Sequence, residues 1–384
     1  MAGTKNAPSS AIATRQCPDN RSSSPRQFTA QTPAPRERFH APSPIPGRIR
    51  IGVIGCGHWG PNHIRNFSAV PGVEVAGAAD SDTQRLGAVA RTYPIVPMSA
   101  DPHQLVNDPD IDALVIATPA GTHYDLAKAA MIAGKDVLCE KPLAVSSRQC
   151  RELVDIAESE GRILMVGHVF LFNPGVRKLR ELIQDGKVGR VYYAHATRTN
   201  LGPIRQDVNA AWDLASHDVS TLNCLFGSPP LRVSASGGRF LQRDIEDVVF
   251  LSLQYPKGVL ANIHVSWMNP KKVRELTVVG DKTMVVWNDL APEGPVRVYD
   301  KGVLQEPYYD TFGEFQLSVR EGDIAIPRVR MTEPLRLQAD HFIECVQQRR
   351  QPISDGRTGL DVVRTLEAVD ASLAQYGASI ALEG

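Results

Sequence analysis

The chain has 384 residues, which is enough for about two domains because one hydrophobic core rarely grows beyond roughly 250–300 residues. Its 42 lysine and arginine residues balance 42 aspartate and glutamate residues, so no net charge draws nucleic acid or an anionic membrane to the protein. The composition therefore argues against both partners and favours small neutral or modestly charged ligands.

Residues 1–47 are rich in Pro, Ser, Thr, Gln and Arg without apolar periodicity, which predicts a disordered extension. This segment lacks the apolar core of a secretory signal, and no run elsewhere approaches the roughly 20 apolar residues that cross a membrane. Its repeated prolines oppose the amphipathic helix of an organelle transit peptide. The six cysteines are scattered without a CxxC pair, which favours reduced thiols in a cytoplasmic protein.

From residue 48 onward, short apolar strands alternate with helices. Strands are expected at 49–54, 73–79, 113–117, 136–139 and 163–167, with helices at 61–69, 83–93, 124–133 and 147–160. This alternation is typical of a doubly wound parallel sheet covered by helices on both faces. We therefore expect an α/β domain of the Rossmann type over residues 48–167.

The turn after the first strand reads Gly55-Cys56-Gly57-His58-Trp59-Gly60, and Asp80 ends the next strand. One glycine permits the tight turn, one lets the backbone approach a pyrophosphate, and one lets the helix pack close to the strand. Asp80 is placed to accept hydrogen bonds from ribose hydroxyls, and its charge would repel a 2′-phosphate. The pattern predicts a dinucleotide site that prefers NAD to NADP.

Two further strands end in chemically distinctive residues, Thr118-Pro119 and Glu140-Lys141-Pro142. The carboxyl ends of strands in an open parallel sheet are where ligands bind. Proline holds the backbone of Lys141 extended, so its side chain could donate to a substrate oxygen undergoing oxidation. The alternative is a lysine in an ordinary surface turn.

After residue 168 the pattern changes to longer β-type runs. A helix at 175–184 precedes strands expected at 191–198, 231–236, 248–255, 259–267, 275–279, 284–287 and 296–299, and helices at 335–348 and 359–376 follow. The turn Tyr255-Pro256-Lys257-Gly258 should join two antiparallel neighbours. These elements predict an α+β domain over residues 168–384, built on an open, mostly antiparallel sheet.

The segment Trp212-Asp213-Leu214-Ala215-Ser216-His217 reads as helix, which would place Asp213 and His217 on one face. A carboxylate beside an imidazole is a plausible proton relay for an alcohol. The same pair could be a surface ion pair or half of a metal site.

Together, the glycine turn, Asp80, Thr118-Pro119, Glu140-Lys141-Pro142 and the pair Asp213 and His217 resemble the glucose-fructose oxidoreductase / inositol dehydrogenase (Gfo/Idh/MocA) family over roughly residues 48 to 380. The resemblance implies hydride transfer between a sugar-like secondary alcohol and nicotinamide. It also implies that the C-terminal open sheet forms a homodimer or homotetramer.

By this resemblance, Lys141 binds the reacting hydroxyl, while His217, oriented by Asp213, acts as the base without a metal. The residues implied to bind the cofactor are Gly55, Gly57, His58, Trp59, Gly60, Asp80, Thr118, Pro119, His123, Glu140 and Lys141.

The motifs Trp59-Gly60-Pro61-Asn62 and Arg198 to Arg205 look most like members that oxidise C3 of a UDP-N-acetylhexosamine. In that subgroup an aminotransferase then aminates the 3-keto sugar. Residues expected to contact the substrate are His168, Asn173, Arg198, Arg205 and Trp212, where a guanidinium suits a diphosphate. Lys271, Lys272 and Arg274 are expected to form a solvated face.

Two other functions remain open. One is an inositol or free-sugar dehydrogenase, or a keto-sugar reductase, with the same site. The other is an NAD-binding sensor or scaffold, since a fold does not fix a function.

Overall fold

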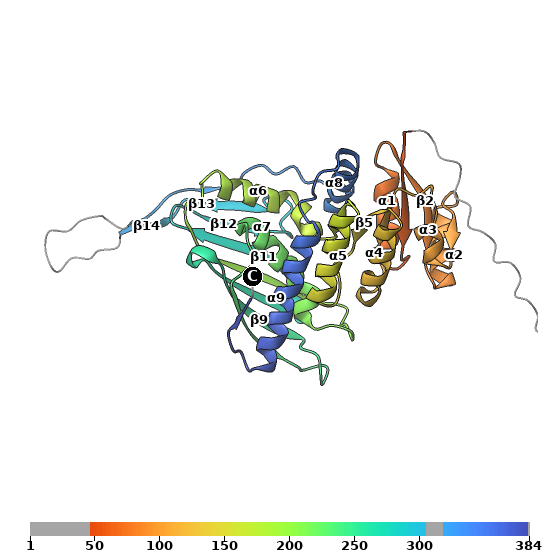
Figure 1. Ribbon diagram of the computed structural model, residues 1–384. Helices are drawn as coiled ribbons and strands as arrows, with labels where there is room; N and C mark the ends of the chain where they lie inside the picture. Colours follow the sequence, from red (N-terminus) through yellow and green to blue (C-terminus); the bar gives the residue numbers. More distant parts are fainter. Residues whose placement is uncertain (1–46, 305–317, 383–384) are drawn as a thin grey trace, which may run out of the picture. The chain divides into compact units, whose positions relative to one another are not determined.

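The computed structural model describes residues 47–304 and 318–382. Apart from Gly47, the extension expected over residues 1–47 lies outside this described part. Figure 1 shows a region of strands flanked by helices near the start of the chain and a second, larger sheet built from later residues.

The first sheet is six-stranded and parallel, with strand order β3-β2-β1-β4-β5-β6. Its strands are β1 (Ile49–Ile54), β2 (Val73–Ala79), β3 (Met98–Ser99), β4 (Ala113–Ile116), β5 (Asp136–Cys139) and β6 (Leu164–Val166). The helices between them are α1 (Gly60–Ser68), α2 (Thr83–Thr92), α3 (Pro102–Val106), α4 (His123–Ile132) and α5 (Ser147–Ser159). The doubly wound parallel sheet expected from the sequence is confirmed.

Two elements of this sheet were not expected, β3 and α3. The side chain of Asp101 caps α3 by accepting the N–H of His103. The strand order reverses between β1 and β4, in the middle of the sheet. Strands β2 and β3 follow on the side of β1, and β5 and β6 follow on the side of β4. In such sheets the crevice for a ligand opens at this point, beside the carboxyl ends of the strands.

The second sheet is nine-stranded, in the order β16-β13-β12-β11-β7-β10-β9-β8-β17. Its strands are β7 (Val191–Leu201), β8 (Arg232–Gly238), β9 (Val248–Gln254), β10 (Leu260–Ser266), β11 (Met268–Gly280), β12 (Met284–Asn288), β13 (Val296–Tyr299), β16 (Ile324–Ala325) and β17 (Ile380–Ala381). Only β10 and β7 pair in parallel, so the mostly antiparallel sheet is confirmed. A separate antiparallel pair joins β14 (Gly302–Leu304) to β15 (Ser318–Arg320).

The turn at Tyr255 to Gly258 joins antiparallel β9 and β10, as the sequence predicted. Two strands exceed their expected lengths. Strand β7 continues to Leu201, and β11 begins at Met268 rather than near residue 275. Residues 268–274 therefore belong to the central part of the sheet.

The second region also carries the helices α6 (Pro174–Gln184), α7 (Ser216–Phe226), α8 (Pro334–Gln348) and α9 (Gly356–Ala374). Helix α9 packs against α5 of the first region and against β8 of the second sheet (Figure 1). Helix α8 contacts α1, which follows the glycine turn. The last two helices thus connect the cofactor region to the second sheet.

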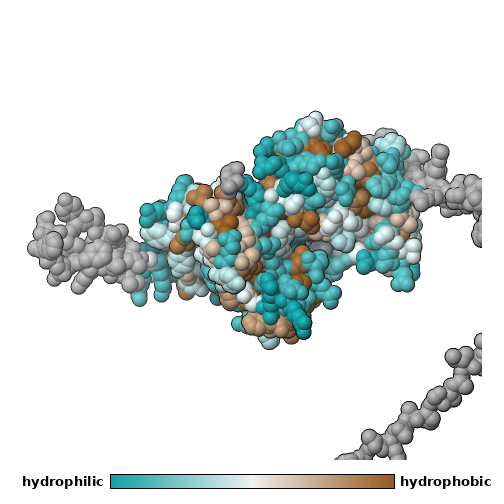
Figure 2. Space-filling model, turned by 60° about the horizontal axis from the view of Figure 1, so that its bottom comes forward, coloured by the Kyte–Doolittle hydropathy of each residue, from teal (hydrophilic) through white to brown (hydrophobic). Residues whose placement is uncertain are grey.

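No helix among the described residues is long and apolar enough to span a membrane. On the face drawn in Figure 2, hydrophobic residues occur in small groups between hydrophilic ones.

Candidate active site

The turn between β1 and α1 is shaped by two of its three glycines. Gly55 has a φ of 99°, and a Cβ at this position would lie 2.5 Å from the carbonyl oxygen of Ala117. A Cβ on Gly60 would lie 1.9 Å from the carbonyl oxygen of Gly55. A Cβ on Gly57, by contrast, would meet only Arg85 Nη1, at 3.7 Å. Gly57 therefore leaves open space beside the N-terminus of α1, where a pyrophosphate fits.

Asp80 lies directly against this turn. Its carboxylate accepts the N–H of Cys56 at 2.7 Å and the N–H of Asp82 at 2.9 Å. The residue thus holds the turn in shape at the end of β2, the position from which an acidic residue reaches the ribose in dinucleotide-binding folds. The His58 and Trp59 rings meet edge to face at 5.2 Å, and both side chains are exposed.

The ends of β4 and β5 are tied together by His123. One ring nitrogen lies 2.7 Å from the carbonyl oxygen of Pro142, and the other lies 2.9 Å from that of Thr118. The Lys141-Pro142 peptide bond is cis. His123 therefore lies behind the two strand ends and holds them at a fixed separation.

A cavity of about 670 Å³ opens beside these strand ends. From the cofactor region, Trp59, Thr118, Pro119, Glu140 and Lys141 line it. From later in the chain, Phe170, Arg198, Arg205, Trp212, Asp213, His217, Lys272 and Arg274 are among its lining residues. The structure thus brings together most of the residues proposed from the sequence.

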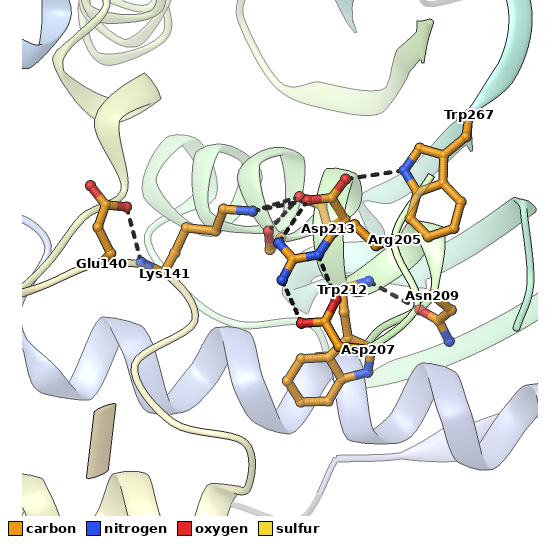
Figure 3. Close-up of polar contacts among 9 residues, drawn as sticks. Glu140, Lys141, Arg205, Asp207, Asn209, Trp212, Asp213 and Trp267 are labelled. Atoms are coloured by element: carbon orange, nitrogen blue, oxygen red, sulfur yellow. Dashed lines mark hydrogen bonds and ion pairs between the residues drawn. The ribbon is translucent and has the colours of Figure 1, made fainter. Parts of the chain in front are cut away.

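Lys141 and Asp213 meet in this cavity from opposite sides (Figure 3). The Lys141 ammonium donates to the Asp213 carbonyl oxygen at 2.8 Å and lies 3.5 Å from its Oδ1. Burial lowers the pKa of Lys141 below its ordinary value, against the opposing effect of the Asp213 and Glu140 charges. The site therefore holds a lysine whose proton is more easily lost than in water.

The expectation that Asp213 orients His217 is not met in this geometry. Asp213 instead lies 3.5 Å from Lys141 Nζ and from Arg205 Nη1, and its Oδ2 accepts the Trp267 indole N–H at 3.0 Å (Figure 3). The cause is a π-helical turn, η3 (Ala211–Ala215), which precedes α7. A π-turn has more residues than an α-turn, so positions four apart no longer lie above one another.

His217 packs against Phe170, whose ring meets the imidazole edge to face at 4.9 Å, and its side chain is half-buried. Its Nδ1 has no hydrogen-bond partner among the described residues. Burial, reinforced by the charges of Lys141 and Arg198, lowers the pKa of His217 well below the usual value. At neutral pH this residue is an uncharged imidazole that can accept a proton.

Two of the proposed substrate contacts lie elsewhere. His168 is buried beneath the cavity rather than in its lining; neither ring nitrogen has a partner among the described residues, and burial lowers its pKa to about 4. Asn173 caps α6 by accepting the Gly175 N–H at 2.8 Å, and its amide donates to Asp289 at 2.9 Å. These bonds commit Asn173 to the fold, so we no longer propose it as a substrate contact.

The other three proposed contacts line the cavity but already have partners. The Arg198 guanidinium forms a buried fork with Asp218 at 2.8 and 2.9 Å, which directs it away from a diphosphate. Arg205 forms a fork with Asp207 at 2.9 and 2.6 Å. The Trp212 indole donates to Asp370 of α9 at 2.7 Å.

The sequence did not identify several residues of the site. Lys272 and Arg274 line the cavity from β11, although a solvated face was expected. Their spacing of two in a strand is the signal that would have placed them on one face. His63, which bonds Glu140, and Trp267 had no comparable signal.

Among the described residues, no group of three or more His, Cys, Asp or Glu is placed to hold a metal ion.

Comparisons with known proteins agree with this architecture. A family model described as "Oxidoreductase family, NAD-binding Rossmann fold" matches residues 49–168, and the GFO/IDH/MocA C-terminal domain matches residues 176–286. Together the two models cover more than half of the chain. The open space at Gly57 and the carboxylate of Asp80 fit the NAD that this family binds.

Three relatives illustrate the range of similarity. Inositol 2-dehydrogenase 2 from Saccharopolyspora erythraea is 33% identical over 56% of this chain and 66% of its own length. The scyllo-inositol 2-dehydrogenase (NAD(+)) from Bacillus subtilis is 27% identical over 83% of this chain and 92% of its own. UDP-N-acetylglucosamine 3-dehydrogenase GnnA from Acidithiobacillus ferrooxidans, a solved structure, has a TM-score of 0.72 at 23% identity, covering 86% of this chain and 99% of that one. That last likeness shows a shared fold.

Proposed function

The chain belongs to the GFO/IDH/MocA family of NAD-binding oxidoreductases, and we propose that it oxidises the C3 hydroxyl of a UDP-N-acetylhexosamine, of the UDP-N-acetylglucosamine type, to a 3-keto sugar. The observation that carries the proposal is the meeting of Lys141 and His217 in one cavity beside the strand ends that form the cofactor crevice. A pathway aminotransferase would consume the ketone.

His217 acts as the base in this proposal. Its imidazole is uncharged at neutral pH and lines the cavity, so a substrate hydroxyl can donate its proton to the ring. NAD, held at the glycine turn and by Asp80, would supply the hydride acceptor for the same carbon. Phe170, whose ring meets the imidazole edge to face at 4.9 Å, shields that side of it from water.

Lys141 stabilises the negative charge that develops on the substrate oxygen. An ammonium has three N–H donors, so Lys141 can keep its bond to the Asp213 carbonyl and still donate to the substrate. The Asp213 carboxylate, which Trp267 holds at 3.0 Å, fixes the ammonium in place. Such a fixed donor stabilises the transition state more than the ground state.

The charge of the cavity supports an anionic substrate. Its lining contains five cationic side chains. Four of them pair with carboxylates: Lys141 with Asp213, Arg198 with Asp218, Arg205 with Asp207 and Arg274 with Asp289. Lys272 is the one left without a partner among the described residues. A neutral cyclitol does not need this excess of positive charge, whereas a nucleoside diphosphate does. We therefore favour a nucleotide-linked sugar.

An inositol dehydrogenase is the second candidate, because the Bacillus subtilis relative that covers 83% of this chain is named a scyllo-inositol 2-dehydrogenase. The site residues would keep the same roles with a smaller substrate. Reduction of a keto sugar would use them in reverse. An NAD-binding sensor or scaffold is less well supported, since Lys141 and His217 would then serve no purpose.

We also propose that the exposed face of the second sheet forms a homodimer or homotetramer. Tyr193, Phe250 and Leu260 are large apolar side chains on the same exposed face of the neighbouring strands β7, β9 and β10. Such patches rarely stay in contact with water on a monomer.

The test of the proposed function compares substrates and variants. The purified protein should form NADH from NAD and UDP-N-acetylglucosamine when an aminotransferase and glutamate remove the ketone. Lys141→Ala and His217→Ala should each lose at least about 100-fold in kcat while binding NAD with nearly unchanged affinity. Turnover of inositol alone would transfer the proposal to the second candidate, and full activity in both variants would refute the mechanism.

A further inference from the structure

Strand β11 presents alternate residues to the cavity. Pro270, Lys272 and Arg274 line it, whereas Lys271 and Val273 do not. Side chains alternate in this way along a strand, and here the alternation holds although the pairing of β11 with β7 is irregular between Met268 and Val273. Lys271 and Lys272 are therefore adjacent in sequence and equal in charge, but only Lys272 belongs to the cavity.

The partners of the cationic side chains distinguish Lys272 from the rest. Lys141 contacts Asp213, Arg198 forks with Asp218, Arg205 forks with Asp207, and Arg274 lies 3.2 Å from Asp289. No residue in the described ranges forms an ion pair or a hydrogen bond with the Lys272 side chain. Its charge is thus free to meet an anion from outside.

Lys272 also lies at the open side of the cavity. Its side chain is exposed, whereas those of Lys141 and His217 are half-buried. Val273, the residue that follows Lys272, pairs with Thr199 of β7, so Lys272 lies across from the Asn200 to Pro203 segment that also lines the cavity. A substrate whose sugar ring reaches His217 must extend toward this segment if it is longer than one ring.

We propose that Lys272 binds the diphosphate of the substrate, and that this contact selects nucleotide-linked sugars over neutral polyols. The inference rests on the proposed function and assigns the substrate class to a specific residue. A lysine ammonium is a compact charge that suits phosphate as an exposed, mobile contact. Arg274, held by Asp289 beside Phe170, adds positive potential without leaving its partner.

The experiment compares Lys272→Gln with Lys271→Gln, which removes the same charge from the opposite face of the same strand. In Lys272→Gln the KM for UDP-N-acetylglucosamine should rise at least about tenfold, as expected for loss of a charged hydrogen bond, with kcat within about twofold of wild type. Lys271→Gln should match the wild type, and Lys272→Arg should recover most of the affinity. Raised salt should increase the KM of the wild type more than that of Lys272→Gln.

Calorimetric titration with UDP alone separates this proposal from the proposed function. If UDP binds the NAD-loaded wild type and Lys272→Gln weakens it at least about tenfold, the subsite stands even when no UDP-sugar is oxidised. Equal effects of Lys271→Gln and Lys272→Gln on KM and on UDP binding would overturn the subsite, even if UDP-N-acetylglucosamine is turned over. Failure of UDP to bind the wild type would overturn it as well.

Discussion

His63 Nε2 lies 2.8 Å from Glu140 Oε1, and both side chains are buried. His63 belongs to α1, directly after the glycine turn, whereas Glu140 precedes Lys141 at the end of β5. Burial raises the pKa of the Glu140 carboxyl, but the hydrogen bond and charge of His63 outweigh it and hold that pKa below its ordinary value. The pair connects helix α1 to the end of β5, directly before Lys141.

Two replacements of His63 should therefore distinguish the effect of losing its hydrogen bond to Glu140 from the effect of losing its ring. His63→Ala leaves the buried Glu140 carboxylate with only the Lys141 backbone N–H, at 3.3 Å, and should lower the free energy of unfolding by about 3 kcal/mol. His63→Gln keeps an N–H donor near the same place and should cost about 1 kcal/mol. Urea unfolding of the three proteins measures both values. Equal losses in the two variants would show that the hydrogen bond contributes little.

The glycine turn gives a second prediction, in which neighbouring glycines behave differently. Gly60→Ala places a methyl group 1.9 Å from the Gly55 carbonyl oxygen, so it should destabilise the fold by at least about 2 kcal/mol. Gly57→Ala meets no backbone atom and should leave the unfolding midpoint nearly unchanged. It should nevertheless weaken NAD binding at least about tenfold, because its methyl group occupies the space of the pyrophosphate.

Thermal unfolding and NAD titration test this pair of variants. Tight NAD binding by a well-folded Gly57→Ala protein would mean that the phosphates do not approach this turn.

The same structure explains how much of the fold the sequence could predict. The strands β1, β2, β4 and β5 are mostly apolar runs followed by distinctive residues, so their order along the chain and the cofactor crevice were predictable. Strand β3 has only two residues, which is too short for any periodicity. Asn173, followed by proline, carried the signature of a helix start, and this signal indicated its capping role better than a substrate contact.

The site was harder to predict than the fold. The π-turn at Ala211–Ala215 separates Asp213 from His217, and the residues of this turn carry no local signal for it. Arg198 pairs with Asp218 and Arg205 pairs with Asp207, and only the folded chain brings these partners within reach. Catalytic residue types were thus visible in the sequence, but their pairing was not.

The pH dependence of oxidation follows from the direction of two pKa shifts. His217 must be uncharged to accept a proton, and its pKa lies well below 6.5, so the acid limb of kcat/KM should lie below pH 6.5. Lys141 must be charged to donate, and its pKa is lowered from 10.5, so activity should begin to fall at a pH below 10.5. The profile is measured from pH 5 to pH 10 in buffers of constant ionic strength. An acid limb above pH 6.5 would exclude His217 as the base in this environment.

His168 predicts how stability depends on pH. Its folded-state pKa is about 4, against 6.5 as the ordinary value, so the unfolded chain binds more protons between these pH values. The free energy of unfolding should therefore fall as the pH falls through 6.5, by up to about 1.4 kcal/mol per pH unit for this one proton. Between pH 6.5 and pH 5, the free energy of unfolding of His168→Gln should fall by about 2 kcal/mol less than that of the wild type. Urea unfolding measures this free energy for both proteins at both pH values. An equal fall in the two proteins would show that His168 does not cause the pH dependence.

The central claim is that a hydride leaves C3 of a UDP-N-acetylhexosamine in the cavity that contains Lys141 and His217. Its most direct test is turnover of UDP-N-acetylglucosamine carrying deuterium at C3, with the recovered NADH examined by mass spectrometry. We expect NADH that carries the deuterium, together with slower turnover than for the unlabelled sugar. NADH without deuterium, or no NADH from this substrate while inositol is oxidised, would contradict the claim.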